Sequence, residues 1–167
     1  KSIGKPGHLS VASDNGEFIA TWRPSLDLRE RQLVDNELKI WKTENMTSIP
    51  VSLPELEDPG LELFGKRNEV QNVGWLIRRV EFSPDATKLI VAVISMLNST
   101  RGYLFAWTTS NGKLIGKPFP FLNPANPVSS NDLPIIKFHP DNQRLLVVGT
   151  RGGTLWNLNT AMSFEPI

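Results

Sequence analysis

Three stretches of the chain repeat one order of apolar and polar positions. Each has an apolar residue, a short polar segment with an aspartate, a charged residue and a second apolar run; the stretches are Val11 to Ala20, Phe82 to Val91 and Phe138 to Val147. Two of them place a proline before the aspartate, which presets φ for a turn, and an aspartate can bond its own backbone two residues on. The pattern predicts a strand, a tight turn and a second strand in each stretch.

A third strand that carries a tryptophan follows each hairpin, at Leu38 to Lys42, Tyr103 to Thr108 and Gly153 to Leu158. A polar turn and a fourth short strand come next. Four antiparallel strands per repeat form the blade of a β-propeller. We expect equivalent buried residues on the innermost strands, namely Val11, Phe82 and Phe138. We also expect one tryptophan per blade to pack between blades, namely Trp41, Trp107 and Trp156.

The repeated unit resembles the WD40 repeat, in which a Ser-Pro-Asp-Gly turn joins the two inner strands and a Trp-Asp pair ends the third. The landmarks that carry the resemblance are the turn residues Asp14, Asp85 and Asp141 and the third-strand residues Trp41, Trp107 and Trp156. These tryptophans are followed by Lys42, Thr108 and Asn157, where the family has aspartate. The resemblance implies an all-β fold with about three four-stranded antiparallel blades.

The turn aspartates lie further apart than the ~40 to 45 residues of a plain blade, so extra residues must lie in loops. Four segments hold them: Trp22 to Asn36, Pro54 to Trp75, Ser95 to Arg101 and Asn123 to Pro134. In an up-and-down blade, the loop between the second and third strands and the connector between blades leave at the same rim. We therefore expect all four segments on one face of the molecule.

The same spacing divides the chain into blades at residues 7–54, 76–121 and 135–167, with connectors at 55–75 and 122–134. The opening KSIGKP, residues 1–6, nearly repeats KLIGKP at 113–118, which we predict to be the outer strand of the second blade. Residues 1–6 would then be the outer strand of a preceding blade. Propellers close with about four to eight blades, so this segment does not close on its own and needs further blades from the same gene product or another chain.

Composition narrows the possible partners. The chain has 167 residues, 18 basic and 17 acidic side chains, and a net charge of +1, which gives no long-range field toward nucleic acid. It has no cysteine, which excludes disulfides and thiolate metal sites. No apolar run reaches the ~18 residues of a membrane span. We expect a soluble, cytoplasmic protein that binds neither nucleic acid nor membrane.

Candidate catalytic groups are few. His8 and His139 have no second ligand at metal-binding spacing, and the acidic run from Glu55 to Glu62 lacks the order of a calcium loop. The serines have no nucleophile elbow around them, and no glycine-rich phosphate loop is present. The sequence therefore predicts no metal, no cofactor and no enzymatic activity.

The remaining interpretation is a non-catalytic scaffold or sensor that binds a protein or peptide through the elaborated loop face. Trp22, Arg29, Arg31 and Trp75 are the candidate contacts, because Arg and Trp dominate interface hot spots. For Trp22 and Trp75, anchoring of a loop is an equal alternative. Two further functions stay open: an architectural segment that completes a ring in a larger assembly, and a small-ligand or enzymatic propeller.

Overall fold

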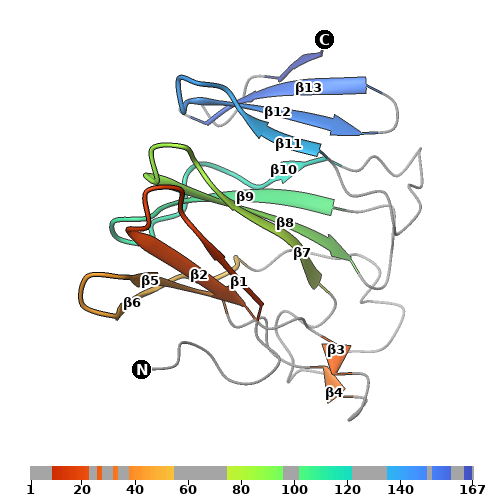
Figure 1. Cartoon of the computed structure of the whole chain (residues 1–167). Coiled ribbons are helices and arrows are strands. Elements are labelled where there is room, and N and C mark those ends of the chain that lie inside the picture. The colour runs from red at the N-terminus through yellow and green to blue at the C-terminus, as the bar shows by residue number, and fades with distance from the viewer. Residues whose placement is uncertain are drawn as a thin grey trace.

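The computed structural model describes residues 9–22, 26–27, 32–33, 38–54, 75–95, 102–121, 135–149, 152–158 and 164–166. Within these residues the chain is all-β and contains no helix (Figure 1). The described residues form three four-stranded sheets and one two-stranded sheet, and all of their strand pairs are antiparallel.

Each four-stranded sheet is an antiparallel meander, and in the first sheet β3 and β4 come between the second and third strands along the chain. The first sheet contains β1 (Leu9–Ala12), β2 (Phe18–Trp22), β5 (Leu38–Lys42) and β6 (Thr47–Pro50). The second contains β7 (Trp75–Phe82), β8 (Lys88–Ser95), β9 (Gly102–Thr108) and β10 (Phe119–Pro120). The third contains β11 (Ile135–Phe138), β12 (Arg144–Gly149), β13 (Gly152–Asn157) and β14 (Phe164–Pro166). The two-stranded sheet pairs β3 (Leu26–Asp27) with β4 (Gln32–Leu33).

Two apolar clusters join the three large sheets face to face. The first cluster contains Ala20 and Ile40 of the first sheet and Phe105 and Trp107 of the second. The second cluster joins the opposite face of the second sheet to the third sheet; its members include Ile90, Leu104, Leu145 and Trp156. Burying such side chains contributes about 25 cal/mol per Å² of apolar surface, so the sheets stabilise one another. The chain is a β-propeller segment of three blades that does not close a ring by itself (Figure 1).

The third-strand tryptophans hold the same register in each sheet. Trp41 pairs with Ile19, Trp107 with Leu89 and Trp156 with Leu145, as the sequence predicts. Trp107 and Trp156 are 1% exposed and belong to the two clusters between the sheets. Trp41 is half-buried, and its indole N–H donates to the Thr21 hydroxyl at 2.9 Å. The expected packing between blades is thus confirmed for Trp107 and Trp156.

Backbone hydrogen bonds correct the alignment of the first hairpin by one residue. The bonds that close the three hairpins run from the N–H of Ser13, Ser83 and His139 to the carbonyls of Phe18, Lys88 and Arg144. Ser13, Ser83 and His139 are therefore equivalent. It follows that Asn15, and not Asp14, corresponds to Asp85 and Asp141, while Ala12, and not Val11, corresponds to Phe82 and Phe138. Phe82 and Phe138 are half-buried, whereas Ala12 is exposed.

Two further expectations about strands are wrong. The outer strand of the second sheet is Phe119–Pro120, and KLIGKP at 113–118 precedes it, touching β9 through the single bridge from Leu114 to Trp107. The segment Trp22 to Asn36 is also more than a loop, because it holds the hairpin of β3 and β4. The matching KSIGKP lies outside the described residues.

Candidate partner-binding rim

The sheets have two different ends. The turn rim carries the tight turns at residues 13–17, 43–46, 83–87, 109–112 and 139–143, which project to the left in Figure 1. The loop rim is the opposite end, where Leu9 and Leu38 pair with Trp22 and where Trp75 pairs with Ser95. All four long segments are flanked by strand ends at the loop rim, and each of these strand ends pairs there with a neighbouring strand.

At the turn rim, side chains of the first two hairpins form the same internal network. The Ser13 hydroxyl accepts the Phe18 N–H at 3.0 Å and donates to the Asn15 amide oxygen at 2.8 Å. That oxygen also accepts the Glu17 N–H at 3.1 Å. In the second hairpin, the Ser83 hydroxyl accepts the Lys88 N–H at 2.9 Å and donates to Asp85 at 2.6 Å.

In the third hairpin His139 takes the place of the serine, and Arg144 binds the turn aspartate with its backbone and its side chain. Asp141 accepts the N–H groups of Gln143 and Arg144 at 2.9 and 3.1 Å, and its second oxygen lies 2.7 Å from the Arg144 Nε. His139 Nδ1 lies 3.1 Å from the same oxygen. The hydrogen bond from the Gln143 N–H, aided by Arg144, holds the pKa of Asp141 well below its usual value. His139 is thus a turn residue, as expected.

Asp85 is also held as a carboxylate. Partial burial acts to raise its pKa, but hydrogen bonds from the Ser83 hydroxyl and from the Thr87 N–H and hydroxyl outweigh this, and its pKa is lowered. The next residue in each hairpin has a left-handed backbone: Gly16 at φ +72°, Ala86 at +57° and Asn142 at +56°. The hydroxyls of Thr43 and Thr109 cap the carbonyls of Gly16 and Ala86 at 2.7 and 2.6 Å. These polar groups hold the turns themselves.

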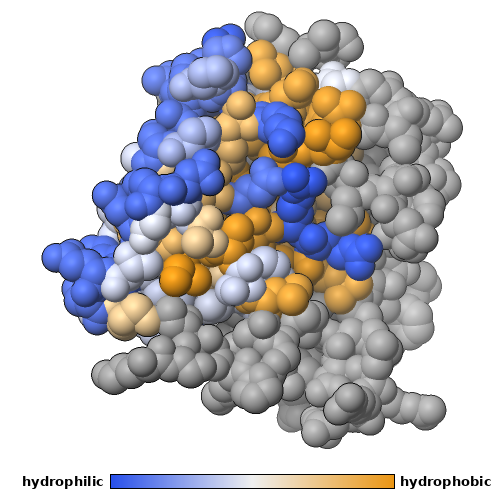
Figure 2. Space-filling view, in the orientation of Figure 1, coloured by the Kyte–Doolittle hydropathy of each residue, from blue (hydrophilic) through white to orange (hydrophobic). Residues whose placement is uncertain are grey.

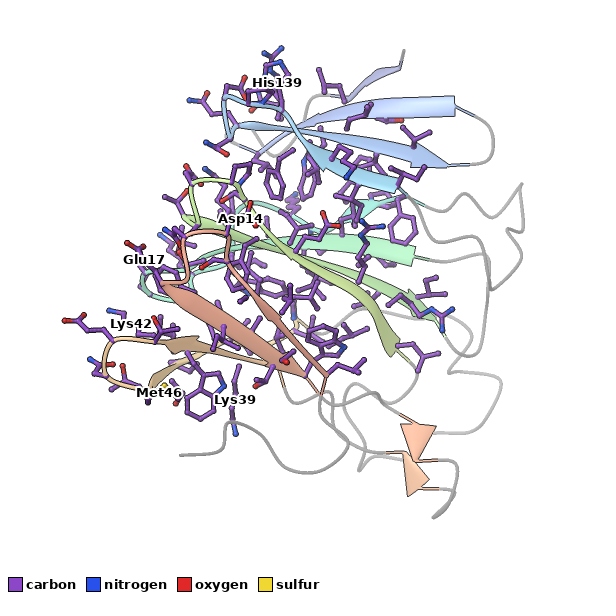
Figure 3. All side chains as sticks on the ribbon, viewed as in Figure 1. Asp14, Glu17, Lys39, Lys42, Met46 and His139 are labelled. Carbon is purple, nitrogen blue, oxygen red and sulfur yellow. The ribbon has the colours of Figure 1, made fainter. Side chains whose placement is uncertain are left out.

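An open groove of about 420 Å³ lies on the turn rim between the first and second sheets. Its lining includes Glu17, Phe18, Asp85, Lys88 and Ser110. Figure 3 shows Asp14 and Glu17 on the turn between β1 and β2, with Lys42 and Met46 at the same end of the sheet. Asp85 is already bonded within its own turn, so the groove offers a ligand chiefly Glu17 and Lys88.

The structure describes one predicted contact residue fully. Trp22 is the last residue of β2; it is 8% exposed and belongs to the first core cluster, with Leu38 and Ile77 among its members. Its Nε1 is buried and has no hydrogen-bond partner among the described residues. Trp75 opens β7, and its side chain lies outside the described residues, as do Arg29 and Arg31 between β3 and β4.

Two apolar residues at the loop rim are exposed although the sequence pattern does not mark them as candidate contacts. Leu9 is 51% exposed and Ile135 is 53% exposed, and they occupy equivalent positions at the start of innermost strands. The corresponding residue of the second sheet is Arg79, which forms an ion pair with Glu81. Figure 2 shows mainly hydrophilic surface along the turn rim and more apolar surface toward the centre of the view. These three positions are equivalent in the corrected hairpin register, because each lies four residues before Ser13, Ser83 or His139.

No group of three or more His, Asp or Glu side chains that could hold a metal ion occurs among the described residues. Within the same part of the chain, no helix is long and apolar enough to cross a membrane.

Comparison with known proteins yields structural neighbours only. No protein-family model matches the chain, and no curated protein sequence matches it. A crystal structure of a putative dipeptidyl aminopeptidase IV from Bacteroides ovatus superposes with a TM-score of 0.54 and 14% identity over 96% of this chain. The chain spans 26% of that protein. A structure of the eukaryotic initiation factor gives a TM-score of 0.35 and 11% identity, covering 94% of this chain and 44% of the other. The first likeness supports the fold alone.

Proposed function

We propose that the chain is part of a WD40-type propeller that acts as a non-catalytic scaffold or sensor and holds a protein or peptide at its loop rim. The observation that carries the proposal is the sidedness of the sheets: all four long segments adjoin one end, and tight turns occupy the other. Binding residues are disproportionately found on loops that a rigid scaffold positions.

The chemistry of the two rims supports the same side. On the turn rim, Ser13, Asn15, Ser83 and Asp85 bond within their own turns. On the loop rim, Leu9 and Ile135 expose apolar surface that a partner can cover.

The repeated turn chemistry supports the WD40 assignment. Each hairpin places Asn15, Asp85 or Asp141 where its side chain accepts a backbone N–H two residues on. The third strands carry tryptophans in one register. Because propellers have about four to eight blades, the proposal includes further blades from the same gene product or another chain. The peptidase named in the structural neighbour is no guide to activity, because 14% identity supports a common fold alone.

Site-specific photo-crosslinking in the intact natural protein tests the proposal. A photoreactive amino acid replaces Arg29 or Trp75, which belong to two of the four long segments, and Glu44 or Ser110, which are exposed on the turn rim, serve as matched positions. We expect the first pair to give one discrete adduct with the same partner and the second pair to give none. Adducts formed only or equally from Glu44 and Ser110 would place binding on the opposite rim.

Binding affinity and melting temperature of three variants of the intact protein provide a second test. Arg29→Ala, Arg31→Ala and Trp75→Ala should each weaken binding of the cross-linked partner while the melting temperature changes little. Truncation of a hot-spot residue costs about 2 kcal/mol or more, which is roughly a thirtyfold rise in Kd. Unchanged Kd in all three variants would contradict the choice of contacts.

A further inference from the structure

Two Asn-Gly pairs lie on the turn rim. Asn15-Gly16 belongs to the turn between β1 and β2, and Asn111-Gly112 to the turn between β9 and β10. Both asparagines are exposed. Asn-Gly is the dipeptide in which the asparagine amide is hydrolysed most readily, because glycine has no Cβ to hinder approach of its backbone nitrogen to the side-chain carbonyl carbon.

The two pairs have similar glycine conformations and hydrogen bonds of the same kinds, closed over turns of different length. Gly16 and Gly112 have φ of +72° and +68°. Their N–H groups donate to the carbonyls of Ser13 and Thr108, both at 2.9 Å. Each asparagine side-chain oxygen accepts one hydroxyl and one backbone N–H, from Ser13 and Glu17 for Asn15, and from Thr108 and Lys113 for Asn111. The Gly16 N–H bonds a carbonyl three residues back and the Gly112 N–H one four residues back, and the Thr43 hydroxyl also caps the Gly16 carbonyl at 2.7 Å. Hydrogen bonding therefore does not make Asn15 the more reactive of the two.

Packing distinguishes them sharply. A Cβ built on Gly16 would meet no atom within 4 Å. A Cβ built on Gly112 would overlap the carbonyl oxygen of Pro50 and lie 3.0 Å from Ile49 Cγ2, both in β6 of the first sheet. Closure of a five-membered ring requires the Asn-Gly backbone to rotate. Rotation at Gly16 must break its hydrogen bonds with Ser13 and Thr43 but meets no atom on the side where a Cβ would lie, whereas the neighbouring sheet crowds Gly112 on that side.

The product also fits the first turn. The positions equivalent to Asn15 hold Asp85 and Asp141, whose carboxylates accept the same backbone N–H two residues on. Hydrogen bonds to a carboxylate are stronger than those to a neutral amide oxygen. Aspartate at position 15 would thus keep the turn and strengthen its acceptor bonds.

From this geometry we propose that Asn15 is a site of hydrolytic deamidation whose α-aspartyl product retains the turn. The Gly16 nitrogen attacks Asn15 Cγ and loses its proton; the N–Cγ bond forms, the Cγ–Nδ2 bond breaks, and ammonia leaves. Water then opens the ring at Cγ to give aspartate, or at the main-chain carbonyl to give isoaspartate. Conversion adds one negative charge close to Glu17, which lines the turn-rim groove.

The test follows both sites in the folded protein at neutral pH by peptide mass spectrometry with fragmentation that distinguishes aspartate from isoaspartate. We expect Asn15 to convert several-fold faster than Asn111 when the protein is folded and at a similar rate when it is unfolded in urea. Conversion of Asn111 as fast as Asn15 in the folded protein would overturn the proposal. So would an Asn15 that stays intact while the unfolded chain is converted.

The second hairpin suggests two matched variants of the first. Gly16→Ala reproduces the second hairpin, where Ala86 adopts the same left-handed conformation, so the variant should fold and should slow conversion at residue 15 several-fold. Asn15→Asp reproduces Asp85 and should melt no lower than the parent. A Gly16→Ala protein that deamidates at the parent rate, or an Asn15→Asp protein that melts clearly lower, would contradict the proposal.

Discussion

Asp85 and Asp141 each accept a backbone N–H two residues along the chain, and Asn15 does the same with an amide oxygen. Both a charged carboxylate and a neutral amide can therefore serve as the acceptor at this position. The difference lies in pH dependence, because the pKa values of Asp85 and Asp141 are lowered by their turn partners. A carboxyl group whose folded pKa lies below its unfolded value stabilises the fold above the unfolded pKa.

Asp85→Asn is expected to remove part of the acid sensitivity of the protein. The stabilisation from Asp85 is present above its unfolded pKa of 3.8 and is lost as pH falls through the lower folded value. Melting temperatures measured from neutral pH down to about pH 3 should fall less steeply in the variant than in the parent. The equivalent turn of the first sheet already holds an amide, that of Asn15, in the same acceptor position. Parallel curves for the two proteins would contradict the assignment.

Gly112→Ala is expected to destabilise the fold. The residue has φ +68°, which costs an alanine about 1–2 kcal/mol, and the new Cβ would overlap the Pro50 carbonyl of the neighbouring sheet. Gly16→Ala is the matched control, because it has the same φ requirement with no neighbouring atom. The denaturation midpoint in urea should fall more for Gly112→Ala. Equal losses would mean that the contact with Pro50 is unimportant.

At the scale of elements, the second sheet differs from its neighbours because both of its faces are covered. β8 is buried at all described positions from Leu89 to Ile94, and β9 is buried from Leu104 to Trp107. Alternate residues of these strands enter the two core clusters, as the period-2 geometry of a strand requires. The tryptophans therefore occupy unequal environments despite their common register.

Trp107→Ala and Trp156→Ala should each cost about 3–5 kcal/mol, because both rings are 1% exposed in the clusters between sheets. Trp41→Ala should cost less, since Trp41 is half-buried and retains contact with solvent. Thermal unfolding followed by circular dichroism compares the three variants. A Trp41 variant as unstable as the other two would indicate a further sheet against the first one.

At the scale of the whole molecule, the outer face of the third sheet carries exposed or half-buried apolar residues. Ile135, Leu146, Val148 and Leu155 alternate with residues of the second core cluster and so lie on the face away from the second sheet. A sheet face of this kind is stable when another layer covers it.

The isolated segment, residues 1–167, is therefore expected to self-associate. Sedimentation should show an average mass that rises with protein concentration, and Leu155→Lys should lower the extent of association. Trp41→Lys, on the first sheet, tests whether the opposite flank takes part. A compact monomer with cooperative unfolding at all concentrations would contradict this expectation.

The amino-acid sequence by itself determined the elements that depend on local chemistry. Period-2 apolar runs, Pro-Asp turns and tryptophans on third strands predict the four-stranded units, and the pairing of Trp107 with Leu89 and Trp156 with Leu145 confirms their register. The sidedness of the long segments also follows from strand order alone. These features are local because a turn and a strand period involve residues close in sequence.

Only the tertiary structure decided the features that depend on distant residues. The aspartate pattern favoured Asp14, but the hydrogen bond from the Ser13 N–H to the Phe18 carbonyl places Asn15 in the acceptor position. The register of a hairpin is set by its backbone hydrogen bonds, whatever residue types lie in the turn. Packing draws Trp22 into the core with Ile77, and the carbonyl of Pro50 confines Gly112. Such contacts join separate sheets, and no local pattern of sequence encodes which atoms meet there.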